Sequence, residues 1–172
     1  MGDVVVLWIH LLAVTLWIGP QVFLFAAAIP AIRTVDDAET RARLTKIMTS
    51  RFGYIGGGAM VVIVITGVVN LYNIDAYSVS ALISGDDDLR FTRIFWEKMT
   101  LVALTIVLTA VHSMFIGPRQ MRLSQQANPD QAEMRNTRRL SIALSGVGLL
   151  ASVGALYLGA ALGHHEYSFV PD

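Results

Sequence analysis

The chain has 172 residues, of which 54% are apolar and only 15% are charged, with 13 basic and 13 acidic side chains. A soluble domain usually carries about 25% charged residues. The zero net charge and the lack of a basic stripe argue against a nucleic-acid-binding protein. No glycine-rich phosphate loop follows a strand-like run, which argues against a nucleotide enzyme. The chain also has no cysteine, which excludes disulfides and thiolate metal sites.

The charged residues are confined to a few segments, and four long windows between them contain no Asp, Glu, Lys or Arg. Each window reaches the roughly 20 apolar residues that a helix needs to cross about 30 Å of hydrocarbon. We therefore expect an all-α integral membrane four-helix bundle, formed by a single transmembrane domain over residues 1–172. The predicted spans cover about 4–32, 52–74, 96–118 and 139–165.

Two of the connections contain helix-start signals. The first connection, residues 33–51, reads as a short polar helix, in which Thr34 and Asp37 resemble a capping box. In the third connection, residues 119–139, Asn128 resembles an N-cap followed by proline at the first helical position. We expect that second helix to continue into the fourth span.

The connections differ in their basic residues. The first and the third carry five Lys and Arg each, whereas the second, residues 75–98, carries three and is acidic in its middle. The positive-inside rule then predicts that the first and third connections are cytoplasmic. Both chain termini and the second connection would face the outer, periplasmic side.

Small residues recur at helical spacing on two spans. On the fourth span they are Ser141, Ser145, Gly148, Ser152, Ala155 and Gly159. On the second span they are Gly53, Gly56, Gly57, Gly58 and Gly67. Such stripes let two helix backbones approach closely, so we expect helix–helix packing there. A flat macrocycle lying against the glycines is the alternative.

All four histidines lie inside the charge-free windows. His10 lies about two turns into the first span and shares one helix face with Trp17, whereas His164 and His165 close the fourth span beside Glu166. Ionisable side chains at such depth face the bundle interior and are candidates for function. The predicted topology places His10 and the His164–His165 pair on the same, outer, side.

The third span carries further candidates on one face. Lys98 begins this span on the outer side, and Thr105, Thr109 and His112 follow on the same face. His112 lies some 20 Å further inward at 1.5 Å of rise per residue. We therefore expect an inner site around His112 and an outer site with His10, Lys98, His164, His165 and Glu166.

Two ligand chemistries suit the outer site. Neutral imidazoles are the axial ligands of haem b, and Lys98 or Arg93 would pair with the haem propionates. The same imidazoles, with Glu166, would suit Cu(II) or zinc. The structural alternatives are an interhelical hydrogen bond for His10 and a position among lipid headgroups for the terminal histidine pair.

Three stretches resemble bacterial four-helix membrane proteins of the CopD and HemJ types. "WIHLLAVTLWIGPQVFLF" resembles their first helix, in which a histidine precedes an aromatic-glycine step. "RFGYIGGGAMVVIVITGVVNLY" is similar to the CopD-type second helix, and "WEKMTLVALTIVLTAVHSMFIGPR" resembles the lysine-led third helix of both groups. The first-helix histidine then corresponds to His10 and the third-helix lysine to Lys98. The chain departs from the HemJ pattern at residues 21–30, which lack the arginine of that family's first helix.

The resemblance implies a four-helix bundle in the bacterial inner membrane. HemJ-like members imply a bound haem b and porphyrinogen oxidation, and CopD-like members imply copper handling. Our leading hypothesis is a haem b-binding electron-transfer protein that is oxidised and reduced within the membrane, with quinol or a porphyrinogen as electron donor. His10 would be one axial ligand, and His112 or the His164–His165 pair would supply another. The alternatives are a copper transport or binding protein and a non-catalytic subunit of a membrane complex or homo-oligomer.

Overall fold

The computed structural model is all-α in the part of the chain that it describes, which is residues 2–73, 79–84, 90–126, 128, 130–164 and 168. Within these residues, four helices are long and apolar enough to cross a membrane: Gly2–Arg33, Ala38–Tyr72, Arg90–Ser124 and Gln131–Gly163. The predicted count of four spans is confirmed. The chain divides into two compact units, Met1–Asp87 and Asp88–Asp172, which are described one at a time.

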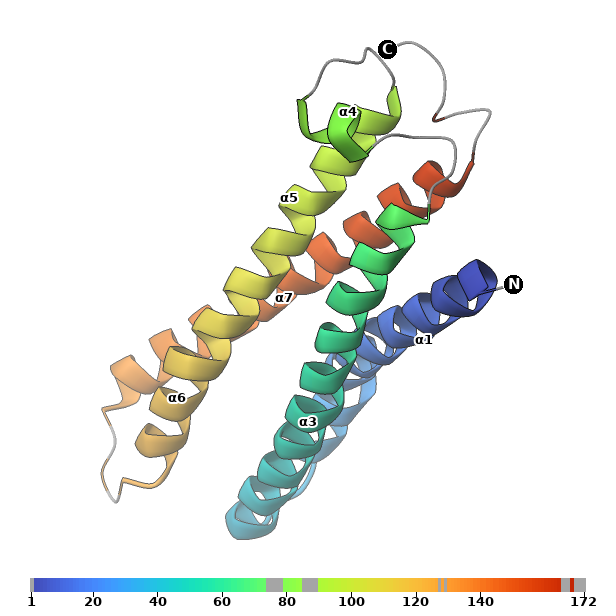
Figure 1. Ribbon diagram of the computed structural model, residues 1–172. Coiled ribbons are helices and arrows are strands. Elements are labelled where there is room, and N and C mark those ends of the chain that lie inside the picture. The colour runs from blue at the N-terminus through green and yellow to red at the C-terminus, as the bar shows by residue number, and fades with distance from the viewer. Residues whose placement is uncertain are drawn as a thin grey trace. The chain divides into compact units, whose positions relative to one another are not determined.

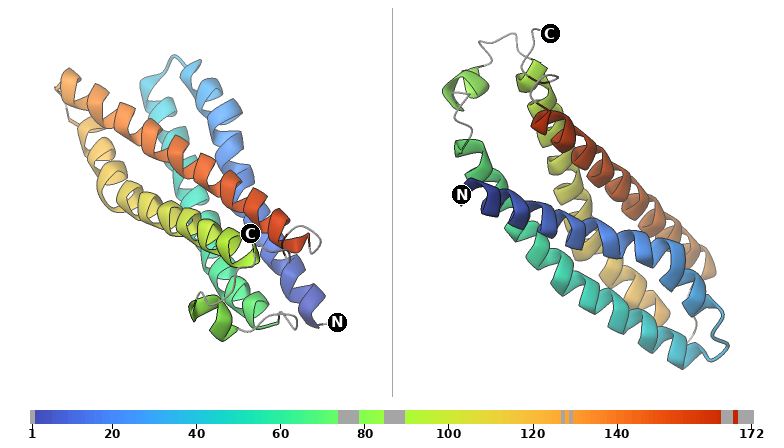
Figure 2. Two further views of the ribbon diagram at one scale, coloured as in Figure 1. Left: turned by 90° about the horizontal axis from the view of Figure 1, so that it is seen from above. Right: turned by 90° about the vertical axis from the view of Figure 1, so that its right-hand side faces the viewer.

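The first unit is an antiparallel helical hairpin (Figure 1). Its first arm consists of α1 (Gly2–Phe23), a π-helical segment η1 (Leu24–Ala28) and α2 (Ile29–Arg33). A short turn leads into α3 (Ala38–Tyr72), which packs back along the first arm, as both views of Figure 2 show. A short helix, α4 (Val79–Ser84), follows.

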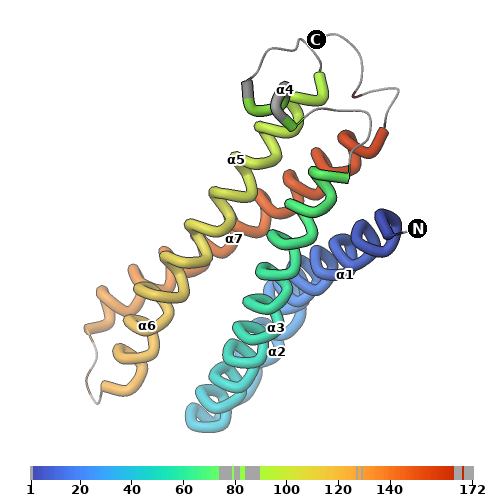
Figure 3. Tube along the Cα trace, viewed as in Figure 1, coloured from blue at the N-terminus to red at the C-terminus, as the bar shows by residue number. Residues whose placement is uncertain are grey.

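The second unit is also a helical hairpin. Its first arm consists of α5 (Arg90–Val111), a π-helical segment η2 (His112–Ile116) and α6 (Gly117–Ser124). Its second arm is α7 (Gln131–Gly163), which packs against α5 along most of its length (Figure 3). The long return helix of each hairpin includes the polar residues that precede the predicted span.

A proline explains the π-helical segment in each hairpin. Pro30 and Pro118 lie just after η1 and η2, near the start of α2 and α6. Proline has no N–H, and its ring crowds the carbonyl group four residues earlier in a regular α-helix. The preceding turn widens instead, so that the N–H of Ile29 donates to the carbonyl of Leu24 and the N–H of Gly117 to that of His112.

The helix starts in the first and third connections differ from the prediction. Asp37 is the N-cap of α3, and its carboxylate accepts a 2.8 Å hydrogen bond from the backbone N–H of Thr40. Hydrogen bonds from Thr40 hold the pKa of Asp37 below its ordinary value. Thr34 instead ends α2, with its hydroxyl group donating to Ala31, so the predicted capping box is wrong. The predicted short helix in this connection is in fact the start of α3.

The N-cap of α7 is Asp130, whose side chain accepts a 2.8 Å hydrogen bond from the N–H of Ala132. The prediction of Asn128 as the N-cap is therefore wrong, and the proline at position 129 lies outside the described residues. The prediction that this helix continues into the fourth span is confirmed, because α7 is continuous from Gln131 to Gly163.

Small residues lie where the two arms of each hairpin meet. In the second unit every member of the predicted α7 stripe is buried or half-buried, and the most buried are Gly148, Ser152 and Ala155. In the first unit the prediction holds for only part of the glycine set. Gly56 packs against Trp17 and Gly67 against His10. A Cβ atom added to Gly53, Gly57 or Gly58 would meet no atom within 4 Å among the described residues.

The outer surfaces of the helices are strongly apolar. Large side chains such as Leu12 on α1, Val61 on α3 and Leu150 on α7 are exposed. Soluble monomers rarely expose contiguous apolar patches of this kind, so these surfaces indicate an apolar environment. The length and the composition of the four helices thus indicate a multi-pass protein in a lipid bilayer.

Candidate functional site

His10 lies on the face of α1 that packs against α3. Its Nδ1 atom is 2.9 Å from the hydroxyl oxygen of Thr66, which is 9% exposed. The same hydroxyl group is 2.6 Å from the backbone carbonyl oxygen of Val62. A carbonyl oxygen only accepts hydrogen bonds, so Thr66 donates its one hydroxyl hydrogen to Val62. The Thr66 oxygen must therefore accept the hydrogen bond from His10.

This hydrogen bond determines the tautomer of His10. Because Nδ1 donates to Thr66, Nδ1 carries the proton, and in the neutral ring Nε2 carries the lone pair. Histidines that bind metals usually donate their other ring N–H to an oxygen atom in this way, which fixes the ring and its tautomer. The predicted interhelical hydrogen bond is present, and it is compatible with a ligand role.

Two glycines let α3 approach the side chains of α1. A Cβ atom at Gly67 would lie 3.4 Å from Cε1 of His10, and one at Gly56 would lie 3.1 Å from Cζ3 of Trp17. Trp17 is buried, and its ring centroid is 6.1 Å from that of Phe52. Trp17 therefore packs inside the hairpin, on the helix face that it shares with His10. The His10 ring packs against α3 at Gly67, which has no side chain.

The predicted face of the third span is present in the second unit. Lys98, Thr109 and His112 on α5 and η2 are half-buried, and Thr105 is buried at 4% exposure. His112 Nε2 is 3.0 Å from the hydroxyl oxygen of Ser141 on α7. Nζ of Lys98 lies 3.6 Å from the position of a Cβ atom at Gly159. Both ionisable side chains of this face therefore contact α7.

The terminal histidines lie at the end of α7. His164 is exposed and caps that helix, with its backbone N–H donating to Ala161 at 3.2 Å. His165 and Glu166 lie outside the described residues. Among the described residues, no three His, Cys, Asp or Glu side chains are close enough together to hold a metal ion. His10 belongs to the first unit, whereas Lys98, His112 and His164 belong to the second.

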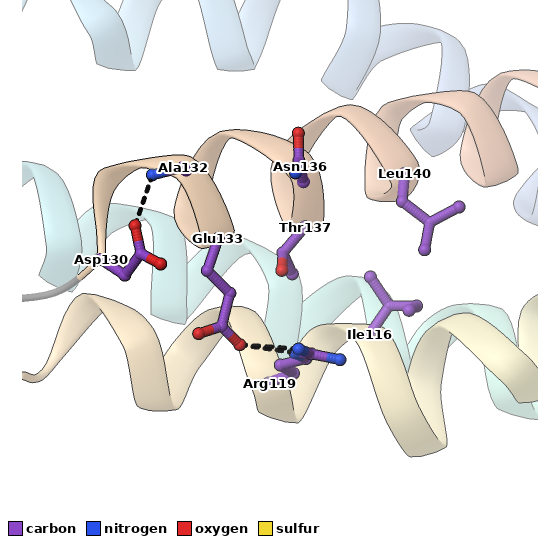
Figure 4. Close-up of a pocket in the computed structure, with 8 residues that line it drawn as sticks. All are labelled: Ile116, Arg119, Asp130, Ala132, Glu133, Asn136, Thr137 and Leu140. Carbon is purple, nitrogen blue, oxygen red and sulfur yellow. Dashed lines mark hydrogen bonds and ion pairs between the residues drawn. The ribbon is translucent and has the colours of Figure 1, made fainter.

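A groove between α6 and α7 was not predicted from the sequence. It has a volume of about 430 Å³ and is lined by Ile116, Arg119, Asp130, Ala132, Glu133, Asn136, Thr137 and Leu140. Figure 4 shows its polar part, where the guanidinium of Arg119 donates to the carboxylate of Glu133 at 2.7 and 3.0 Å. This ion pair links the two arms near their connection and leaves no unpaired charge on Arg119.

Sequence reasoning also missed the hydroxyl partners of the histidines, Thr66 and Ser141. Thr66 precedes Gly67 in a "TG" step that the sequence shows, and Ser141 belongs to the α7 stripe. Both residues look like ordinary packing residues in a sequence. Only the pairing of α1 with α3 and of α5 with α7 shows that they meet imidazole rings.

The fold and the buried ionisable side chains define a class, that of small multi-pass helical membrane proteins with four transmembrane-length helices. The chain belongs to the family described as "Domain of unknown function (DUF4149)", which matches residues 12–129, more than half of the chain. The match covers Thr66, Lys98 and His112, and it begins two residues after His10. No curated protein and no solved structure matches the chain. The similarity to CopD-type and HemJ-type proteins stays a prediction.

Proposed function

We propose that this protein binds haem b in the membrane through His10 and transfers electrons. The observation that carries the proposal is the hydrogen bond from Nδ1 of His10 to Thr66, whose own hydrogen is already donated to Val62. It leaves the lone pair of a neutral imidazole on Nε2. That is the form in which histidine is an axial ligand of haem iron.

The surroundings of His10 fit an apolar cofactor. The ring lies over Gly67, and no charged side chain interrupts residues 4–32 or 52–74 of the two helices that flank it. A low dielectric strengthens the hydrogen bond to Thr66. When bound, haem would supply the one-electron chemistry. The protein would provide ligation, burial and orientation.

The rest of the coordination sphere belongs to the same proposal. The pair His164–His165 is the candidate for a further axial ligand beside His10, and His112, on the inner side, is the candidate ligand of a second haem. Nε2 of His112 bonds to Ser141, so Nδ1 is the ring nitrogen that His112 would offer. A lipid-soluble quinol or a porphyrinogen is the proposed electron donor, because either would reach a cofactor inside the bilayer from the lipid.

The proposed setting is the bacterial inner membrane, with both chain termini outside. The support for this orientation is the distribution of Lys and Arg, which is five, three and five over the successive connections. With α1 starting outside, His10 would lie in the outer half of the bilayer, about two turns from the start of its helix.

The test is a reduced-minus-oxidised visible spectrum of the detergent-purified protein, produced with ample haem, with a pyridine haemochrome count on the same sample. We expect a Soret shift with sharp α and β bands for the wild type. His10→Ala should lose most of this signal. Thr15→Ala is the matched control on the same helix, because the Thr15 side chain is exposed and bonds only within its own helix, to Leu11.

A wild-type spectrum without haem bands would overturn the haem proposal, and bound copper in the same preparation would favour the copper alternative. A His10→Ala protein with an unchanged Soret band and haem count would show that His10 is not the ligand.

A further inference from the structure

The two hairpins repeat the same helical plan. α1 begins at Gly2 and α5 at Arg90, while η1 begins at Leu24 and η2 at His112. Each pair is 88 residues apart, and the prolines that follow, Pro30 and Pro118, are separated by the same 88 residues. The order of α-helix, π-helical segment, short α-helix and long return helix is also shared.

The sequences support this correspondence. With the 88-residue spacing, identical residues coincide on the first arms at Trp8 and Trp96, Val14 and Val102, Leu16 and Leu104, Ile18 and Ile106, and Pro30 and Pro118. With a spacing of 92, identical residues coincide on the return helices at Arg43 and Arg135, Thr45 and Thr137, Gly56 and Gly148, Ala59 and Ala151, Val61 and Val153, and Gly67 and Gly159. Two of these pairs, Gly56 with Gly148 and Ala59 with Ala151, are buried in both hairpins. The chain is therefore an internal repeat of one hairpin.

The repeat makes Lys98 the counterpart of His10. His10 plus 88 is position 98, and the glycine beneath His10, Gly67, corresponds to Gly159. The contact is conserved between the hairpins, because a Cβ atom would lie 3.4 Å from the His10 ring at Gly67 and 3.6 Å from Lys98 Nζ at Gly159. Each hairpin thus holds one nitrogen base over a glycine of its return helix.

The charge of Lys98 is not matched within the described part of the chain. The nearest acidic residue in sequence, Glu97, accepts a 3.1 Å hydrogen bond from Arg93, and this pair lies on the exposed surface of α5. No described acidic side chain forms an ion pair with Lys98, which points the other way, onto α7. A cation in an apolar span is costly unless an anion pairs with it.

We propose that Lys98, held over Gly159, binds the carboxylate of an apolar ligand. A single ammonium group matches one negative charge, and Gly159 places no side chain against it. The proposal deepens the haem function on which it rests, since haem b carries two propionates. It does not depend on the iron, because the contact that it names is to the carboxylate.

The experiment uses metal-free protoporphyrin IX and its dimethyl ester, titrated by fluorescence against the full-length protein in nanodiscs. Removing the iron removes any contribution of His10 as an axial ligand, so this test is separate from the test of haem ligation. We expect the diacid to bind the wild type about tenfold more tightly than the ester, the size of a charge-assisted hydrogen bond. Lys98→Met should abolish this ratio and Lys98→Arg should keep most of it. Thr15→Ala, at an exposed position that bonds only to Leu11, should leave the ratio unchanged.

Oleate and methyl oleate form the second arm, which separates a porphyrin source of the carboxylate from a fatty-acid source. A ratio that depends on Lys98 in either arm supports the carboxylate site and identifies the source. The proposal is overturned if neither acid is preferred over its ester, or if Lys98→Met keeps the preference of the wild type. A thermal unfolding curve of each variant in the same nanodiscs checks that it is folded.

Discussion

The hydroxyl group of Thr66 governs the chemistry that His10 can offer. A threonine side chain has one hydrogen, and in α3 that hydrogen goes to the carbonyl of Val62. What is left for His10 is an acceptor, so the proton of the imidazole stays on Nδ1. In the second hairpin the hydroxyl group of Ser141 meets His112 through Nε2 instead. The two histidines therefore bond to hydroxyl groups through different ring nitrogens.

Removing that acceptor should weaken haem binding. Thr66→Val keeps the shape of the side chain but leaves the Nδ1–H of His10 without its oxygen partner, so that neither the ring nor its tautomer is fixed. Loss of such an outer partner typically lowers metal affinity by about 10- to 100-fold. Haem titration followed at the Soret band measures the change. Thr66→Ser keeps the hydroxyl group and should bind like the wild type; equal affinity of all three proteins would contradict this role of Thr66.

The hairpins themselves are built on closely approaching helices. Among the glycines of α3, Gly56 has the tightest surroundings, because the indole of Trp17 fills the space that a side chain would take. Gly57, one residue along α3, points about 100° away on the helix, and a Cβ atom there would meet nothing within 4 Å among the described residues. Neighbouring glycines thus differ completely in what they contribute.

Substituting these two glycines by alanine should separate packing from helix propensity. Gly56→Ala places a methyl group 3.1 Å from a rigid ring, and such overpacking costs about 1–3 kcal/mol of unfolding free energy. Gly57→Ala meets no atom and should be neutral or stabilising by up to about 1 kcal/mol, because alanine favours the helix. Thermal unfolding in one detergent compares them. If the unfolding temperature of Gly56→Ala equals or exceeds that of Gly57→Ala, the close contact between Gly56 and Trp17 does not stabilise the hairpin.

The same glycines show how far sequence reasoning reaches. The spans could be predicted because the cost of burying charge leaves long charge-free windows. The caps could not, since each connection offers several Asp, Asn and Thr side chains and the choice among them depends on the local backbone. The partners of His10 and Lys98 depend on how each helix is rotated about its axis. A periodic pattern gives the face of a helix but not the residue opposite, so Thr66 and Gly159 emerged only from the structure.

At the scale of the whole molecule, repetition of one hairpin accounts for both the common features and the differences. The exposed tryptophans Trp8 and Trp96 occupy equivalent positions, as expected for interfacial anchors at the start of each hairpin. Two residues later the repeats diverge, with His10 in the first hairpin and Lys98 in the second. A duplicated scaffold thus carries an imidazole in one hairpin and an amine in the other.

The repeat also bears on topology, because two hairpins of two spans each would start on the same side of the bilayer. The basic residues of the first and third connections predict that this starting side is the outside. The chain has no cysteine, so single cysteines can be introduced without a background. Asp36→Cys and Gln126→Cys lie in exposed positions of those two connections, and Asn73→Cys lies at the exposed opposite end of α3.

In intact bacterial cells a membrane-impermeant maleimide should label Asn73→Cys and spare Asp36→Cys and Gln126→Cys, which should react only after the cells are permeabilised. The reason is electrostatic, since the five basic residues of each spared connection favour the cytoplasm. The opposite labelling pattern would invert the orientation and move His10 and Lys98 to the cytoplasmic half of the bilayer. Labelling of Asp36→Cys but not Gln126→Cys would be incompatible with two hairpins that start on the same side.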